Sequence, residues 1–106
     1  MEKKLKIIRE FKNALINKAN IKIKDVILFG SQAKNTATED SDYDVLVVIN
    51  EPETMELRHK LADITFDFYM KYEVFLDSFI ATNPEVNLVN NKTPQIDDAI
   101  TQGIFI

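Results

Sequence analysis

Residues 26–49 read VILFGSQAKNTATEDSDYDVLVVI, and this stretch decides the fold of the chain. It begins with one apolar run, residues 26–29, and ends with another, residues 45–49. Short runs rich in Val, Ile and Leu are typical of buried β-strands. The acids Asp42 and Asp44 stand just before the second run. The stretch therefore predicts two strands joined by a short polar connection.

The first strand ends in a Gly-Ser pair, Gly30 and Ser31, followed by small polar residues that favour a short helical turn. Exposed backbone amides and a hydroxyl at the mouth of such a turn can receive phosphate oxygens. Gly30 would let the phosphates approach the backbone closely. Taken alone, the pair is better interpreted as a simple strand-to-helix turn with a serine cap.

The acids add a second element to this site. Because residues 31–41 form only a short connection, the second strand, over residues 43–50, should run antiparallel to the first. Asp42 and Asp44 should then lie near Ser31, and two residues apart on a strand they point to the same side. Two such carboxylates repel one another without a cation, and they are oxygen ligands suited to magnesium rather than zinc.

The remaining chain supplies helices for both faces of a sheet. The apolar pattern predicts helices over residues 2–18 and 53–72, and strands over residues 21–29 and 72–80. Thr93-Pro94 opens a further helix that Gly103 stops before a terminal Ile-Phe-Ile, and Asn83-Pro84 opens a shorter one. The unbroken apolar run in the second strand indicates burial on both faces. We therefore expect an α/β (α+β) fold, one domain over residues 1–106 with a small mixed β-sheet flanked by helices.

A third carboxylate is expected at the same edge of the sheet. The helix over residues 53–72 returns the chain, so the third strand can run parallel to the second and begin beside the two acids. Glu73 stands at the predicted start of that strand. Asp77 is a second choice, because at roughly 3.3 Å per residue it lies about 13 Å further along.

Other patterns favour ordinary structural roles. Asp40, Asp42, Asp44 and Glu51 match four positions of a calcium-binding loop, but the position that needs glycine is Val45. This interpretation therefore fails.

Two further groups lie on or after the helix over residues 53–72. His59, Asp63 and Asp67 recur at four-residue steps, which is typical of a solvated stripe rather than a metal site. Four aromatic residues are expected in the core: Phe66, Phe68, Tyr69 and Phe75.

Composition excludes several classes of protein. Thirteen basic and seventeen acidic residues give a net charge of -4, which argues against a protein that holds long nucleic acid through nonspecific phosphate contacts. The chain has no cysteine, so it has no disulfide, thiolate metal site or cysteine nucleophile. Its apolar runs are far shorter than the roughly 20 residues that span a bilayer, and residues 2–12 are too charged for a secretory signal. We expect a cytoplasmic protein without a membrane partner.

The Gly-Ser turn followed by an Asp-x-Asp pair resembles the signature of the DNA polymerase β-like nucleotidyltransferase superfamily, in particular its minimal nucleotidyltransferases of bacteria and archaea. The motif covers residues 26–49, and the order of elements extends the likeness loosely over the chain. The resemblance implies an enzyme that transfers a nucleoside monophosphate, AMP from ATP or its equivalent from another triphosphate, to a hydroxyl. It implies a triphosphate on Gly30 and Ser31, and two Mg²⁺ ions on Asp42 and Asp44, with Glu73 matching the third acid.

The sequence departs from the family pattern at three positions. The usual Ala-Arg-Gly after the serine is Ala33-Lys34-Asn35 here, and the third acid is usually aspartate rather than Glu73. Lys34 keeps the positive charge and is expected to bind nucleotide, while Asn35 adopts the left-handed conformation almost as glycine does.

The family also suggests partners. Its minimal members accompany helical HEPN-type toxins and act as antitoxins, by adenylylating or covering the toxin. The acceptor site could equally come from a second copy in a homo-oligomer. A different class stays open beside the enzyme: a nucleotide-binding or protein-binding antitoxin or regulatory module with little catalysis, which Asn35 and Glu73 favour.

Overall fold

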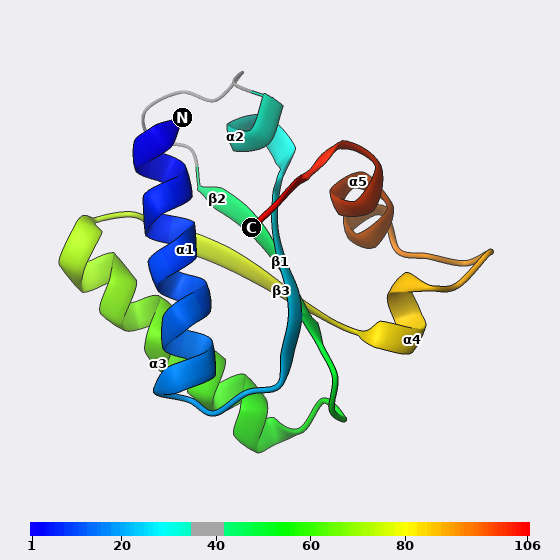
Figure 1. Ribbon diagram of the computed structural model, residues 1–106, viewed down its shortest axis with the longest axis horizontal. Helices are drawn as coiled ribbons and strands as arrows, with labels where there is room; N and C mark the ends of the chain where they lie inside the picture. The colour runs from blue at the N-terminus through cyan, green and yellow to red at the C-terminus, as the bar shows by residue number, and fades with distance from the viewer. Residues whose placement is uncertain (35–41) are drawn as a thin grey trace.

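The computed structural model describes residues 1–34 and 42–106, and its centre is a four-stranded β-sheet in the order β3-β2-β1-β4 (Figure 1). The first half of the described chain comprises α1 (Glu2–Asn17), β1 (Ile23–Phe29), α2 (Gly30–Lys34) and β2 (Tyr43–Ile49). The second half comprises α3 (Met55–Tyr72), β3 (Leu76–Thr82), α4 (Asn83–Val86), α5 (Pro94–Gln102) and β4 (Ile104–Phe105).

The sheet is mixed, as predicted. β1 pairs antiparallel with β2, and β2 pairs parallel with β3 across the α3 crossover. β4 pairs antiparallel with the other edge of β1, a pairing that the sequence did not predict for the terminal Ile-Phe-Ile. The predicted α/β fold, with helices flanking a small mixed sheet, is therefore confirmed.

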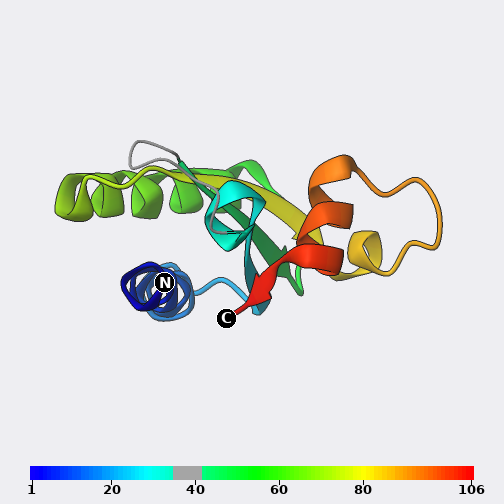
Figure 2. The same ribbon diagram turned by 90° about the horizontal axis from the view of Figure 1, so that it is seen from above.

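Helices cover the two faces of the sheet unequally (Figure 2). On one face, α1 and α3 pack against the larger apolar cluster, where the Phe11 and Phe68 rings meet edge to face with centroids 5.6 Å apart. On the other face, α5 covers a smaller cluster with Ile96 and Ala99. We call these the α1/α3 face and the α5 face. Alternating β2 residues enter the two clusters, which confirms that this strand is buried on both sides.

The helix boundaries follow from local chemistry. The Thr54 hydroxyl caps α3 by accepting the amide of Leu57 at 3.1 Å, and Thr93 caps α5 in the same way through the amide of Ile96. Pro94 fits the first turn of α5, where a missing amide hydrogen costs nothing.

The end of α3 differs from the prediction. Glu73 follows the helix in the left-handed conformation, with φ of 56°, and its amide donates to the Tyr69 carbonyl at 2.8 Å. The prediction that the third strand starts at residue 72 was therefore wrong, because this cap turns the chain first and β3 begins only at Leu76.

The aromatic residues assigned to the core are also only partly there. Phe68 is buried, but Phe66, Tyr69 and Phe75 are 63%, 50% and 47% exposed. α3 carries two apolar stripes, and the sheet covers only the one formed by Leu57, Leu61, Ile64 and Phe68. Periodicity alone does not tell which of two stripes faces the sheet.

No helix in the described part of the chain is both long and apolar enough to cross a bilayer.

Candidate nucleotidyl-transfer site

The Gly-Ser turn and one acid meet at a single rim of the sheet. Phe29, the last residue of β1, is paired with Asp44 on β2. Gly30 follows with φ of 71°, and a Cβ atom there would collide with Oδ2 of Asp44. The backbone angle therefore favours glycine, and a side chain at this position would also displace the Asp44 carboxylate. The predicted proximity of turn and acid is confirmed for Asp44.

A second acid lies directly across from Asp44. In the parallel pairing of β2 with β3, Asp44 is opposite Asp77, and neighbouring strands are about 4.8 Å apart. The residues that precede these acids, Tyr43 and Leu76, are packed in the cluster on the α1/α3 face. Because side chains alternate along a strand, both acids point to the α5 face. Asp77, the second choice from sequence, thus occupies the place expected for the third carboxylate.

The ionised form of Asp44 is disfavoured by its surroundings at this rim. Burial raises the pKa of Asp44 above its ordinary 3.8, and the nearby carboxylates of Asp77, Asp42 and Asp98 raise it further, in that order. Asp42 lies just before β2 and is exposed. A half-buried carboxylate surrounded by three others is the environment in which a bound cation relieves the repulsion.

Sequence reasoning missed Asp98. It lies on α5, 64 residues after Lys34, and its Oδ1 accepts a hydrogen bond from the Lys34 ammonium at 3.3 Å. The capped helix could be predicted from Thr93-Pro94, but no local pattern shows that α5 folds back over the Gly-Ser turn. The predicted nucleotide-binding Lys34 is therefore held at the same rim as the acids.

Glu73 does not share the position of these acids. It is exposed, in the cap between α3 and β3, and precedes the first residue of β3 by three positions. The predicted position of Glu73 at the start of the third strand was wrong.

The described residues contain no ready-made metal cage. Within residues 1–34 and 42–106, no three His, Asp or Glu side chains are already grouped closely enough to hold an ion. Asn35 and Asp40, both singled out from sequence, lie outside the described residues. His59 and the two aspartates near it on α3 are exposed, in agreement with a solvated stripe.

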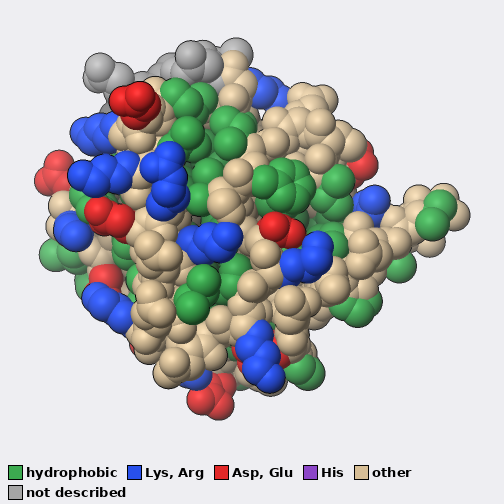
Figure 3. Space-filling model, viewed as in Figure 1, with side chains coloured by type: hydrophobic (Ala, Val, Ile, Leu, Met, Phe, Trp, Pro, Cys, Tyr) green, Lys and Arg blue, Asp and Glu red, His purple; other side chains and the backbone are tan. Residues whose placement is uncertain are grey.

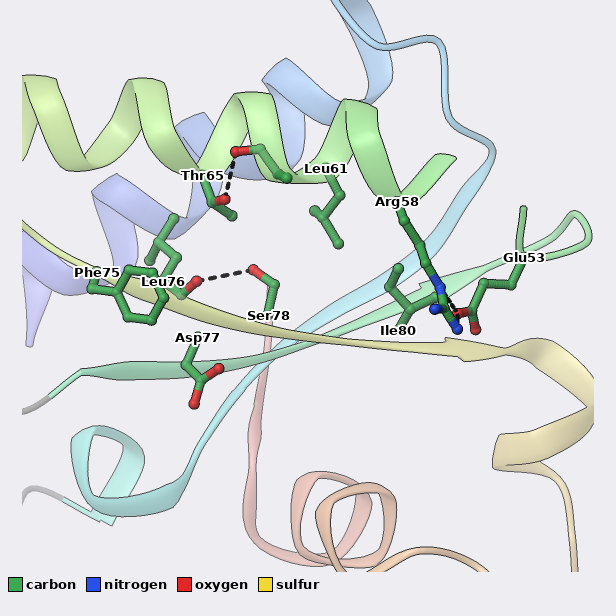
Figure 4. Close-up of a pocket in the computed structure, with 10 residues that line it drawn as sticks. Glu53, Arg58, Leu61, Thr65, Phe75, Leu76, Asp77, Ser78 and Ile80 are labelled. Carbon is green, nitrogen blue, oxygen red and sulfur yellow. Dashed lines mark hydrogen bonds and ion pairs between the residues drawn. The ribbon is translucent and has the colours of Figure 1, made fainter. Parts of the chain in front are cut away.

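A cavity of about 390 Å³ lies on the other side of Asp77 (Figure 4). It is formed between α3 and β3 on the α1/α3 face, and ten residues line it: Glu53, Arg58, Leu61, Ala62, Thr65, Phe75, Leu76, Asp77, Ser78 and Ile80. In Figure 4, Ser78 points toward α3 while Asp77 points away from it. The cavity and the acids therefore meet at β3 but open to opposite faces.

Basic residues gather elsewhere. Figure 3 shows several Lys and Arg side chains over α1, where Lys3, Lys6 and Arg9 are exposed. They lie on the helix surface turned away from the sheet, because the opposite surface of α1 carries its buried Ile and Phe residues. A solvated basic stripe on an acidic chain accounts for this surface.

Comparison with known proteins identifies the family of the chain. Residues 8–101 match the family described as "Nucleotidyltransferase domain". The chain is 31% identical over 102 residues to the protein named "Putative protein adenylyltransferase MJ0141" from Methanocaldococcus jannaschii, covering 96% of this chain and 97% of that protein. It is 33% identical over 90 residues to "Putative protein adenylyltransferase MJ0604" from the same organism, covering 77% of each.

Proposed function

Because the chain belongs to the nucleotidyltransferase domain family, we propose that it transfers AMP from ATP to a hydroxyl group on a protein. The observation that carries the proposal is the position of Asp44, against Gly30 of the Gly-Ser turn and opposite Asp77. The relatives named as protein adenylyltransferases support the choice of nucleotide and of acceptor. The chain is a transferase, and the proposal concerns what it transfers and by which residues.

The triphosphate would lie across the Gly-Ser turn. The amides after Gly30 and the half-buried Ser31 hydroxyl would donate to phosphate oxygens. Lys34 has three N–H donors, of which Asp98 uses one, so two stay available for phosphate.

The acids fit a divalent cation by their chemistry. Burial and the neighbouring carboxylates disfavour the ionised form of Asp44, and a cation held between these acids would offset their repulsion. Asp42, Asp44 and Asp77 would hold two Mg²⁺ ions, which would polarise the phosphate oxygens and acidify the acceptor hydroxyl. Asp77 takes the role that the sequence suggested for Glu73.

The transfer itself is an in-line displacement. The acceptor oxygen forms a bond to the α-phosphorus, the bond from the α-phosphorus to the bridging oxygen breaks, and pyrophosphate leaves. The hydroxyl proton passes to the carboxylate of Asp77, which lies on the edge strand from which an acceptor can approach.

Calorimetry with MgATP and transfer of label from α-³²P-ATP test this proposal. Wild type should bind MgATP, and Asp42→Asn with Asp44→Asn should abolish label transfer while the protein stays folded. The matched control is Asp63→Asn with Asp67→Asn, which removes two exposed acids from α3 and should transfer label as wild type does. Label transfer by the Asp42/Asp44 variant would refute the metal assignment.

A nucleotide-binding module without catalysis is a second candidate. It is favoured by the lack of a preformed three-acid group among the described residues. MgATP binding without label transfer to any protein or RNA would support the module, and an absence of MgATP binding would exclude both candidates.

The acceptor in our proposal is a small helical partner of the HEPN toxin type, for which this chain would act as antitoxin, or a second copy of the chain. Copurification of the tagged chain from its own cells, followed by mass measurement of the partner, decides between them. A partner whose mass rises by one AMP in the presence of MgATP would identify the acceptor.

A further inference from the structure

Among residues 1–34 and 42–106, the outer edge of β3 has no pairing strand. β3 is the terminal strand of the sheet, whereas β4 covers part of the edge of β1 at the opposite end. The Phe75 carbonyl accepts the Tyr43 amide at 3.0 Å, so the main-chain groups of residue 75 point toward the chain at β2. Because these groups alternate along a strand, the amides and carbonyls of Leu76, Ser78 and Ile80 point outward.

This edge lacks most of the features that usually prevent another strand from pairing, and Asp77 is the one charged residue of β3. β3 reads LDSFIAT and contains no lysine, arginine or proline. Natural edge strands are commonly protected by such residues, by bulges or by a covering segment. In the described part of the chain no strand pairs with this edge. A further extended segment can therefore form main-chain hydrogen bonds along β3.

The cavity beside this edge would receive side chains of that segment. Its volume of about 390 Å³ is larger than one large side chain occupies. Its apolar lining includes Leu61, Ala62, Phe75 and Ile80. Arg58 at its far end forms an ion pair with Glu53, so these two charges neutralise each other. An occupant that carries uncharged apolar side chains fits this lining.

Side chains alternate along a strand, so one segment added to β3 would reach both the cavity and the acids. In a strand added to β3, the residue opposite Asp77 faces the acids, with Cβ atoms about 4.5–5.5 Å apart. The residues immediately before and after it face the α1/α3 side, where the cavity lies. A hydroxyl residue between two apolar residues would place its oxygen at Asp77 and its neighbours toward the cavity.

The charges favour polypeptide over RNA as the occupant. The chain carries a net charge of -4 and β3 itself has no lysine or arginine, so this edge offers no cation to pair with the phosphates of an RNA backbone. A polypeptide backbone is uncharged and matches the outward amides and carbonyls of β3.

We propose that the β3 edge and the adjoining cavity bind the acceptor as an extended polypeptide segment, with a Ser, Thr or Tyr hydroxyl opposite Asp77 and apolar residues on either side of it. This rests on the proposed function, and it adds the form in which the acceptor is bound. The bond changes are those of the proposed transfer: the acceptor oxygen is joined to the α-phosphorus, pyrophosphate leaves, and the proton goes to Asp77.

A peptide array tests the sequence rule. Nine-residue peptides with a central Ser, Thr or Tyr and every residue type at the two flanking positions are incubated with wild type, Mg²⁺ and α-³²P-ATP. Apolar flanking residues should give about tenfold more label than Asp or Lys at those positions, equivalent to roughly 1.4 kcal/mol. Labelling that ignores the flanking residues, or label on RNA but not on peptides, would overturn the inference.

Two variants test the edge and the cavity separately. Ser78→Pro removes one outward N–H without touching the ladder to β2, and should lower peptide labelling about tenfold while the variant still binds MgATP. Ser78→Ala measures how much of that loss belongs to the hydroxyl, which donates to the Leu76 carbonyl at 3.2 Å. Ala62→Arg should block the cavity with a similar loss, and Asp63→Arg, one residue away on the solvated side of α3, is its matched control.

The results separate this inference from the proposed function. Peptide labelling by Ser78→Pro and Ala62→Arg at the wild-type level would overturn the inference and leave the nucleotide site intact. Absence of MgATP binding by wild type would refute the proposed function, and the inference with it.

Discussion

The two faces of the β-sheet differ in what they are built from. The α1/α3 face consists of long helices whose apolar residues recur at helical spacing and fill the larger cluster. The α5 face combines a smaller cluster with a five-residue helix, four aspartates and one lysine at the rim. One face therefore consists mainly of apolar packing, and the other brings several like charges together at the rim of the same sheet. We therefore expect mutations on the two faces to change different properties.

Truncation of the core on the α1/α3 face should give the largest effect. Phe11 is fully buried against Phe68, so Phe11→Ala should lower the free energy of unfolding by about 3–5 kcal/mol. Ile96→Ala on the α5 face should cost about 2–4 kcal/mol. Urea unfolding followed by circular dichroism measures both.

The same pair of variants separates stability from function. Ile96 lies on α5, two residues before Asp98, so its truncation should also weaken MgATP binding by the folded fraction. Phe11→Ala should leave that affinity unchanged. Equal effects of the two variants on MgATP affinity would contradict the division of roles between the faces.

Separate substitutions of Asp77 and Glu73, the two acids near the start of β3, test which of them is the third carboxylate. Asp77→Asn should lower the rate of label transfer by on the order of 100-fold, because it removes a ligand and proton acceptor next to Asp44. Glu73→Gln changes an exposed cap residue and should stay within about twofold of wild type. The reverse ranking would restore Glu73 and remove Asp77 from the site.

The pH dependence of stability should report on Asp44. Its pKa is raised in the folded state, so the ionised carboxylate costs stability once the pH rises above the ordinary value of 3.8. Asp44→Asn cannot ionise, so its free energy of unfolding relative to wild type should increase as the pH rises from 3.8 through the raised pKa. Unfolding in EDTA measures this difference, and a difference that stays flat or falls would show that Asp44 is not destabilised by ionisation.

The smallest effect concerns the ion pair at the rim. Asp98→Asn should weaken MgATP binding about two- to fivefold, because Lys34 is then no longer held beside the acids. Asp97→Asn is a matched control on the same helix turn, and its carboxylate is exposed. An equal response of Asp97→Asn and Asp98→Asn would show a general charge effect instead of a contact with Lys34.

The sequence predicted the order and pairing of the first three strands better than the start of β3 and the long-range contacts. Both strands around the Gly-Ser turn, the antiparallel pairing that brings Asp44 to Gly30, and the parallel third strand followed from apolar runs and connection lengths. The start of β3 did not, because the left-handed cap falls on Glu73, and this conformation is typical of glycine or asparagine. An error of four residues in that boundary exchanged Asp77 for Glu73.

Tertiary contacts explain the other differences. Asp98 reaches Lys34 only because α5 packs across the α5 face, and a contact over 64 residues leaves no local pattern. Phe66 and Tyr69 form an apolar stripe as regular as the buried one, but α3 turns the other stripe toward the sheet and leaves this one exposed. Periodicity identifies amphipathic stripes, whereas the partner of each stripe depends on the whole fold.

The central claim is that Asp42, Asp44 and Asp77 form one cation site beside the Gly-Ser turn. A crystal structure with Mn²⁺ and a non-hydrolysable ATP analogue, measured at the manganese absorption edge, tests it most directly. We predict anomalous peaks within bonding distance of Asp44 and Asp77, with the triphosphate on Gly30 and Ser31. Manganese bound at Glu73, or a triphosphate bound away from the turn, would contradict the account.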